Sequence, residues 1–146
     1  MAEIAPLEMG DLQIAHALLE ERFRDDPEPM PSWREGDQRL LETCQRCTEV
    51  SAFGRLKYPT LVEKTAKLFY SGIKLHAFPN GNKRFGVVLT LVFLIKNGHR
   101  VQAAPGELSY MATWVAKTKP HLDAGKPDLI TDRLIRFFET RIEPYD

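Results

Sequence analysis

The sequence has no surplus of positive charge, no long apolar run and no second pair of cysteines, and each absence excludes a class of protein. Lys and Arg together number 20, as do Asp and Glu, so the formal net charge is zero. Proteins that bind nucleic acid over a broad surface usually carry a basic surplus, so we expect no nucleic-acid partner. The balance is still compatible with a local basic site.

The longest apolar run covers residues 87–95 and is interrupted by Thr90. It is far shorter than the ~18 residues of a membrane-spanning helix, so we expect no membrane partner. The N-terminus carries Glu3, Glu8 and Asp11 before any long apolar stretch, which is not the pattern of a secretory signal. We therefore expect a soluble protein of the cytoplasm.

The two cysteines, Cys44 and Cys47, form a C-x-x-C pair. A structural zinc site needs four ligands, and the sequence contains neither a second cysteine pair nor an H-x-x-x-H to complete one. A thioredoxin-like motif belongs beside a βαβ unit, and no such pattern is present. We interpret the pair as reduced thiols packed on or beside a helix.

Apolar residues recur at helical spacing through the first half of the chain. The pattern predicts a helix after Asp11, which would be its N-cap, and a second helix that opens near Asp37. Three prolines in residues 26–31 exclude a helix between them. A third helix is expected from about Thr60.

The second half continues the helical pattern. Residues 82–96 are apolar almost all round, which is typical of a buried helix, and Asn97 followed by Gly98 marks its end. Two further helices are expected, at residues 106–117 and 128–142, with a loop between them at residues 120–127.

Residues 51–58 differ from the rest, because aromatic and apolar residues surround Gly54 and Pro59 closes the segment. This composition predicts a short extended segment or a β-hairpin. No other segment indicates a sheet, and a length of 146 residues suits one domain. The predicted fold is therefore mainly α: a compact single-domain helical bundle over residues 1–146 with a hairpin or extended flap.

Residues 76–84 read His-Ala-Phe-Pro-Asn-Gly-Asn-Lys-Arg and concentrate groups that bind phosphate. Gly81 permits a tight turn, and the first amides of the helix after it favour an anion. Lys83 and Arg84 add two cations at this end, where cations are unfavourable for the helix unless an anion binds. This local conflict indicates a polyphosphate site.

His76 lies just before this loop, where a histidine can take a proton from an incoming hydroxyl. The side-chain amide of Asn82 can donate to a phosphate oxygen. The alternative is a structural histidine before a solvated helix start. The segment is not a P-loop, because G-x-x-x-x-G-K-[ST] is absent.

The segment resembles the motif of the Fic/Doc (death-on-curing) family, written H-P-F-x-[DE]-G-N-G-R. The matching positions are His76, Phe78, Gly81, Asn82 and Arg84. The Doc branch has G-N-K-R instead, and Lys83 makes the chain similar to that branch. The resemblance covers about residues 37–117.

The resemblance implies a Doc-like toxin-type transferase that moves a phosphate from ATP to a hydroxyl of a target protein in the translation machinery. His76 would be the catalytic base, and Gly81, Asn82, Lys83 and Arg84 would hold the phosphates. The alternative activity is that of a nucleotidyltransferase, which leaves an adenylyl group on its protein target (AMPylation).

Asn80 falls where the family has its acidic magnesium ligand. A neutral amide oxygen is a weaker Mg²⁺ ligand than a carboxylate, so Mg²⁺ would bind weakly or indirectly through ATP phosphates and water. Three explanations stay open: an active variant with altered metal use, a natural pseudoenzyme, or an engineered inactive form. An inactive domain would be a binding module for a nucleotide or a protein.

Many members of the family inhibit themselves through a helix with the motif [ST]-x-x-x-E-[GN], which this sequence lacks. The resemblance to the Doc branch instead implies inhibition in trans by an antitoxin protein whose disordered tail folds on the toxin. Residues 51–58 correspond to the family's flap, where a target strand docks. The alternative for this segment is an ordinary surface loop.

Overall fold

The computed structural model describes residues 3–119 and 127–145, which contain six α-helices, two 3-10 helices and two small sheets. The α-helices are α1 (Met9–Arg22), α2 (Gln38–Arg46), α3 (Leu61–Lys74), α4 (Asn82–Lys96), α5 (Glu107–Lys117) and α6 (Pro127–Glu139). The 3-10 helices η1 (Trp33–Glu35) and η2 (Cys47–Glu49) flank α2. The predicted mainly α fold is confirmed. Of the predicted loop at 120–127, all but Pro127 lies outside the described residues.

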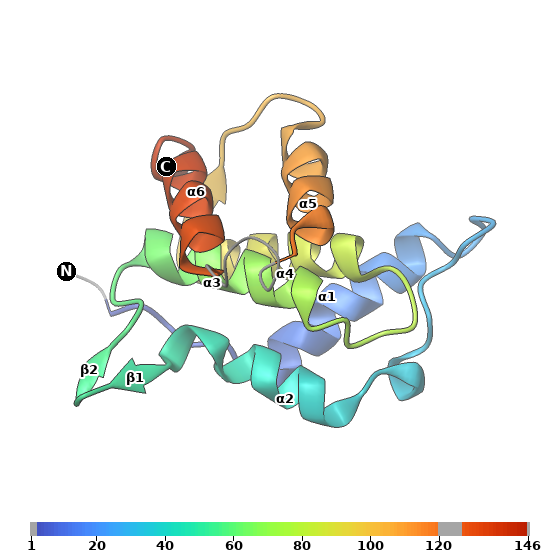
Figure 1. Cartoon of the computed structure of the whole chain (residues 1–146). Coiled ribbons are helices and arrows are strands. Elements are labelled where there is room, and N and C mark those ends of the chain that lie inside the picture. Colours follow the sequence, from blue (N-terminus) through green and yellow to red (C-terminus); the bar gives the residue numbers. More distant parts are fainter. Residues whose placement is uncertain (1–2, 120–126, 146) are drawn as a thin grey trace.

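Helices α3 and α4 form the centre of the molecule, with α5 and α6 on one side and α1 and α2 on the other (Figure 1). The contact between α3 and α4 is the most extensive between any two described elements. It is close because two glycines meet at the crossing: a Cβ added to Gly72 would lie 2.8 Å from Cα of Gly86. The crossing therefore requires these residues to lack side chains.

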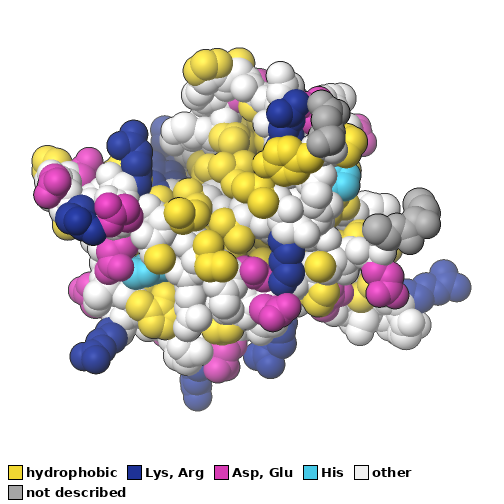
Figure 2. Space-filling view, turned by 180° about the vertical axis from the view of Figure 1, so that it is seen from behind, with side chains coloured by type: hydrophobic (Ala, Val, Ile, Leu, Met, Phe, Trp, Pro, Cys, Tyr) yellow, Lys and Arg dark blue, Asp and Glu magenta, His cyan; other side chains and the backbone are white. Residues whose placement is uncertain are grey.

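Two apolar clusters lie on either side of this central pair. The first joins α1, α2, the α3–α4 loop and α4, with Leu12, Leu41, Phe78, Phe85 and Phe93 among its buried members. The second joins α3, α5 and α6 and includes Phe69, Met111, Val115, Leu134 and Phe138. On the face opposite to Figure 1, apolar side chains also gather across the middle of the surface, with charged side chains mostly around them (Figure 2).

The segment predicted to be either extended or a hairpin forms a hairpin. Strand β1 (Ser51–Ala52) pairs antiparallel with β2 (Arg55–Leu56), with Ser51 opposite Leu56. The structure adds a second sheet that was not predicted, in which β3 (His99–Val101) pairs with β4 (Ile142–Pro144). The helix predicted over 128–142 therefore ends early, at Glu139. These three-residue strands are far apart in sequence, so no local periodicity indicates their pairing.

The start of α1 also differs from the prediction. Its N-cap is Glu8, and Asp11 is the third residue of the helix, where its carboxylate accepts the Glu8 N–H at 2.8 Å. Asp37 and Thr60, by contrast, cap α2 and α3 as predicted. Within residues 3–119 and 127–145, no helix combines the length and apolar content needed to cross a bilayer.

Candidate functional site

The loop between α3 and α4 carries two residues in the left-handed region of backbone space. His76 has φ +55° and Gly81, the N-cap of α4, has φ +79°. Glycine adopts this conformation at no steric cost, whereas other residues are strained there. A Cβ at Gly81 would also lie 2.8 Å from Sδ of Met30, so the Met30 side chain would have to shift.

The side chain of Asn82 holds the loop in shape. Its Oδ1 accepts from the Phe78 N–H at 3.1 Å, and its Nδ2 donates to the Phe78 carbonyl at 2.8 Å. These two bonds determine which atom of the side-chain amide is the oxygen and which is the nitrogen. Asn82 is only 6% exposed, so the pair replaces solvent for two backbone groups of the loop.

The second hydrogen of the Asn82 amide is directed at His76, whose Nδ1 lies 3.2 Å from Nδ2. An amide nitrogen only donates, so Nδ1 accepts, and the neutral ring carries its proton on Nε2. Proton uptake at Nε2 therefore requires the ring to change tautomer and give up this contact. Both side-chain hydrogens of Asn82 are engaged within the loop, which leaves its backbone N–H for an anion.

Phe78 anchors the loop in the first apolar cluster. Its ring is 1% exposed, stacks on His16 at a centroid distance of 5.4 Å and meets Phe85 edge-on at 5.1 Å. The neighbouring carbonyl of Ala77 accepts the Asp37 N–H at 2.7 Å. The start of α2 and the core thus both fix the position of the loop that carries His76.

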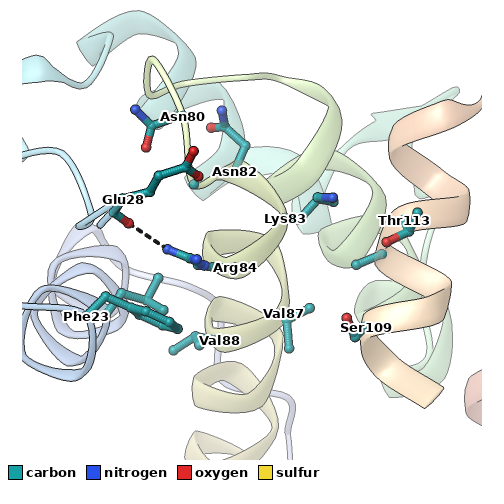
Figure 3. A pocket seen from close by; sticks show the side chains of 13 residues that line it. Phe23, Glu28, Asn80, Asn82, Lys83, Arg84, Val87, Val88, Ser109 and Thr113 are labelled. Atoms are coloured by element: carbon teal, nitrogen blue, oxygen red, sulfur yellow. Dashed lines mark hydrogen bonds between the residues drawn. The ribbon is translucent and has the colours of Figure 1, made fainter. Parts of the chain in front are cut away.

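A cavity of about 490 Å³ opens where α4 begins, between α1 and α5 (Figure 3). Its lining residues are Leu19, Phe23, Glu28, Asn80, Gly81, Asn82, Lys83, Arg84, Val87, Val88, Ser109, Ala112 and Thr113. Five of the six site residues predicted from the sequence, all except His76, are among them. His76 belongs to the adjacent loop and reaches the cavity lining through its contact with Asn82.

Arg84 is held from two sides. Its Nη1 donates to the carbonyl oxygen of Glu28 at 3.0 Å, and its guanidinium lies 3.9 Å from the centroid of the Phe23 ring. Lys83 is exposed and lies on the α5 side of the cavity, facing Thr113 in the close-up (Figure 3). Both cations therefore border the cavity at the positive end of the α4 dipole.

Sequence reasoning missed the cavity residues that α1, α5 and the α1–η1 segment contribute. Phe23 fits the apolar series of α1, and Ser109 and Thr113 lie on the polar side of α5. Glu28 lies between Pro27 and Pro29 in a segment without periodicity. None of them has a local signal, because their position at the cavity depends on tertiary packing alone.

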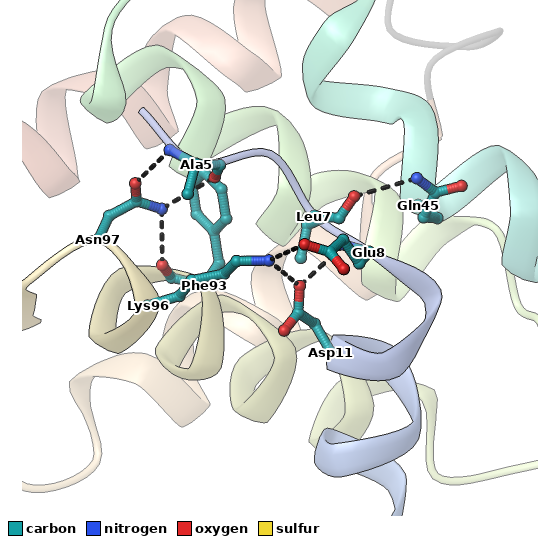
Figure 4. A network of polar contacts seen from close by, with 8 residues as sticks. All are labelled: Ala5, Leu7, Glu8, Asp11, Gln45, Phe93, Lys96 and Asn97. Carbon is teal, nitrogen blue, oxygen red and sulfur yellow. Dashed lines mark hydrogen bonds and ion pairs between the residues drawn. The ribbon is translucent and has the colours of Figure 1, made fainter. Parts of the chain in front are cut away.

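The far end of α4 is fixed by a polar network (Figure 4). Asn97 accepts the Ala5 N–H at 2.7 Å and donates to the carbonyl of Phe93 at 3.0 Å. Nζ of Lys96 lies 2.8 Å from Asp11 and 3.1 Å from Glu8. The helix that begins at the cavity is thus tied at its other end to the N-terminal segment and α1.

The cysteines are buried and free, as predicted. The hydrogen bond between the two thiols raises the pKa of Cys44 and lowers that of Cys47. Cys47 lines a different cavity, next to Ser71 of α3. The pair is therefore separate from the cavity at the start of α4.

A model of the Fic/DOC family matches residues 6–94, which extend from the segment before α1 through the loop of His76 and into α4. The matched part thus includes the described lining residues from α1, the α1–η1 segment and α4. No curated protein and no solved structure matches the chain.

Proposed function

Because the chain belongs to the Fic/DOC family, whose members are generally transferases acting on proteins, we propose that it moves the terminal phosphate of ATP to a hydroxyl of a target protein. The observation that carries the proposal is the cavity at the start of α4, which brings Lys83 and Arg84 together beside the loop of His76. A Doc-like activity is favoured over nucleotidyl transfer by Lys83, which stands where the motif of the nucleotidylating members has glycine.

The phosphates would be held by three kinds of donor. The amides that follow Gly81 have no partners inside the helix and point toward an anion. Arg84 offers a planar fork that suits two phosphate oxygens, and the contacts with Phe23 and Glu28 restrict its orientation. Lys83 adds a mobile point charge. Together they would stabilise the negative charge of the transferred group.

In the proposed reaction the target's hydroxyl oxygen attacks the terminal phosphorus of ATP. The bond from that phosphorus to the bridging oxygen breaks, and ADP leaves with the electron pair. The hydroxyl proton passes to Nε2 of His76, after the ring has taken the tautomer that leaves this nitrogen free. The left-handed backbone of His76 supports a functional role, since strained residues are concentrated at functional sites.

The donor set fits Mg²⁺ that is bound chiefly through the nucleotide. Asn80 is exposed and lines the cavity, so its amide oxygen can approach a phosphate-bound ion. Within the described residues, no group of three or more His, Cys, Asp or Glu side chains could hold a metal alone. When bound, Mg²⁺ would neutralise charge on the phosphate oxygens.

The target would dock on the hairpin of β1 and β2. Phe53 at its tip is fully exposed, and both Phe53 (φ +53°) and Gly54 (φ +77°) are left-handed, which is the geometry of a type I′ turn. In the described part of the chain, Phe53 and His76 are the non-glycine residues with positive φ. An aromatic residue kept in a strained, exposed position supports a role in protein contact.

An antitoxin that inhibits in trans remains part of the proposal. Large apolar side chains are exposed on three neighbouring helices, including Leu18 of α1, Ile95 of α4 and Tyr110 of α5. We propose that these side chains form part of the contact with the antitoxin. An amphipathic segment that folds on binding would suit it.

The proposal is tested by incubating the chain with Mg²⁺, a bacterial lysate and ATP labelled either on the terminal or on the innermost phosphate. We expect label to move to a protein only from the terminal position. Transfer from the innermost position would establish a nucleotidyltransferase instead. If neither label moves but Asn80→Asp restores transfer, the chain is a disabled copy of a competent fold. If neither the unaltered chain nor Asn80→Asp transfers label, the second candidate function, a binding module without catalysis, is favoured. Asn80 is the residue that supports this candidate.

A further inference from the structure

The cavity at the start of α4 contains a carboxylate to which the proposed phosphate site assigns no role, that of Glu28. Figure 3 shows this side chain extending from the α1–η1 segment toward Asn80 and Asn82. Among the residues that the structure describes, the hydrogen bonds of Glu28 involve only its backbone, and its carboxylate has no partner. An exposed negative charge that has no partner in the described ranges 3–119 and 127–145 thus faces the place proposed for the phosphates.

The backbone of Glu28 is held by two hydrogen bonds, while its side chain is exposed. Its N–H donates to Oδ1 of Asp26 at 2.9 Å, and its carbonyl accepts from Nη1 of Arg84 at 3.0 Å. Pro27 precedes it and Pro29 follows it, and both rings restrict the backbone of this segment. The side chain therefore leaves the backbone from a point that is tied directly to Arg84, one of the proposed phosphate donors.

A carboxylate beside a triphosphate is repulsive unless a cation lies between them. Mg²⁺ is usually held by one or two carboxylates together with phosphate oxygens and water. Asn80 provides an amide oxygen to this cavity but no charge. Glu28 and Asn80 together provide one carboxylate and one amide oxygen on the same side of the loop. Proteins that bind Mg²⁺ together with a nucleotide usually supply about this number of ligands.

We propose that Glu28 is the carboxylate ligand of a Mg²⁺ ion bound together with the nucleotide phosphates. The α1–η1 segment would then supply the charge that Asn80 lacks. The inference rests on the proposed nucleotide site, because the protein groups alone are too few to form a metal cage. It makes the chain a variant with an altered metal ligand rather than one without a metal.

The test is ATP binding to the full chain by isothermal titration calorimetry at constant ionic strength, once in EDTA and once in Mg²⁺. In the unaltered chain, Mg²⁺ should tighten ATP binding. Glu28→Gln should reduce this gain by about tenfold or more, as loss of a group supporting a bound metal commonly does. In EDTA, Glu28→Gln should bind ATP equally well or better, since a negative charge is removed from beside the phosphates.

A matched control is Glu20→Gln, which makes the same charge change on the exposed surface of α1 and outside the cavity. It should behave as the unaltered chain. A second variant relocates the charge: Asn80→Asp, added to Glu28→Gln, should restore the gain from Mg²⁺. Thermal unfolding of each variant checks that the fold is retained.

The outcomes separate this inference from the proposed function. Binding of ATP in EDTA tests the phosphate site without the metal. If the unaltered chain binds no ATP in either EDTA or Mg²⁺, both the proposed nucleotide site and the metal role of Glu28 are overturned. If ATP binds and Glu28→Gln leaves the gain from Mg²⁺ unchanged, only the metal role of Glu28 is overturned. An equal change of affinity in EDTA and in Mg²⁺ would also overturn it, because Glu28 would then act on the phosphates directly.

Discussion

The ring of Phe23, at the end of α1, lies against the guanidinium of Arg84, with 3.9 Å between the ring centroid and Cζ. The carbonyl of Glu28 holds the same guanidinium through Nη1. The aromatic face and the carbonyl restrict the fork to a small range of orientations at the edge of the cavity. Orientation, in addition to charge, is therefore what α1 and the segment after it would contribute to the proposed phosphate site.

Arg84→Lys should weaken ATP binding although it conserves the charge. Lysine has no planar fork, so it loses the stacking on Phe23 and the paired donation to phosphate oxygens. We expect affinity to fall about tenfold, which corresponds to about 1.4 kcal/mol. Calorimetric titration measures it, with Arg34→Lys in the exposed helix η1 as the matched control. Equal affinities for both variants would show that only charge matters at position 84.

Gly86→Ala should destabilise the domain. The added Cβ would lie 2.5 Å from Cγ1 and 3.1 Å from the backbone nitrogen of Ile73, so α3 and α4 would have to move apart. Overpacking of this kind costs about 1–3 kcal/mol. Gly10→Ala in α1 is the control, because no atom lies within 4 Å of its Cβ position. It should be neutral or stabilising by about 0.5 kcal/mol. The urea concentration at the midpoint of unfolding is measured for both variants. Similar midpoints for Gly86→Ala and Gly10→Ala would contradict the close crossing of α3 and α4.

Phe53→Gly should have opposite effects on stability and on function. Glycine removes the strain of a left-handed aromatic residue, about 1 kcal/mol, so the hairpin should open less often. The amide of Lys57, which donates to the Val50 carbonyl at 2.9 Å, should exchange its hydrogen more slowly. Modification of the target protein should fall, while ATP binding stays unchanged. If modification is retained, the hairpin tip does not dock the target.

Glu107→Gln should remove a pH-dependent part of the stability. Hydrogen bonds from Arg141 and from the Ala104 N–H hold the pKa of Glu107 below its ordinary value of 4.5. A lowered carboxyl pKa contributes stability that is present above the ordinary pKa and is lost as the pH falls through the lowered one. The variant should therefore be less stable than the unaltered chain at neutral pH, and the gap should close under acid. Thermal unfolding followed from neutral to acidic pH measures it, and a constant gap would contradict the assignment.

The parts of the fold that follow local rules could be predicted from the sequence. The helix that opens after Gly81 and ends before Asn97 was predicted with its observed bounds, because a left-handed start and a glycine stop leave local signals. The hairpin followed from aromatic residues around Gly54. Asp11 misled the prediction, since it belongs to a capping box whose first member is Glu8.

Other parts depend on tertiary contacts and could not be predicted. Leu18 continues the apolar series of α1, yet it is 53% exposed, and Leu129 of α6 is 56% exposed. The motif of the proposed phosphate site could be found in the sequence because its residues are consecutive. Glu28 and Phe23 could not, because they reach the same cavity from a segment more than 50 positions earlier, as the 56-residue separation of the Arg84–Glu28 bond shows.

The proposed phosphate transfer is tested best by comparing the unaltered chain with His76→Ala, using ATP labelled on the terminal phosphate and the target-containing lysate. His76 is exposed and does not line the cavity, so the variant should bind ATP with unchanged affinity. It should transfer at least about a hundredfold less label, the usual contribution of a general base. Equal binding with lost transfer would support His76 as the base beside a separate phosphate site. Transfer at an unchanged rate would remove His76 from the mechanism and contradict the proposed reaction.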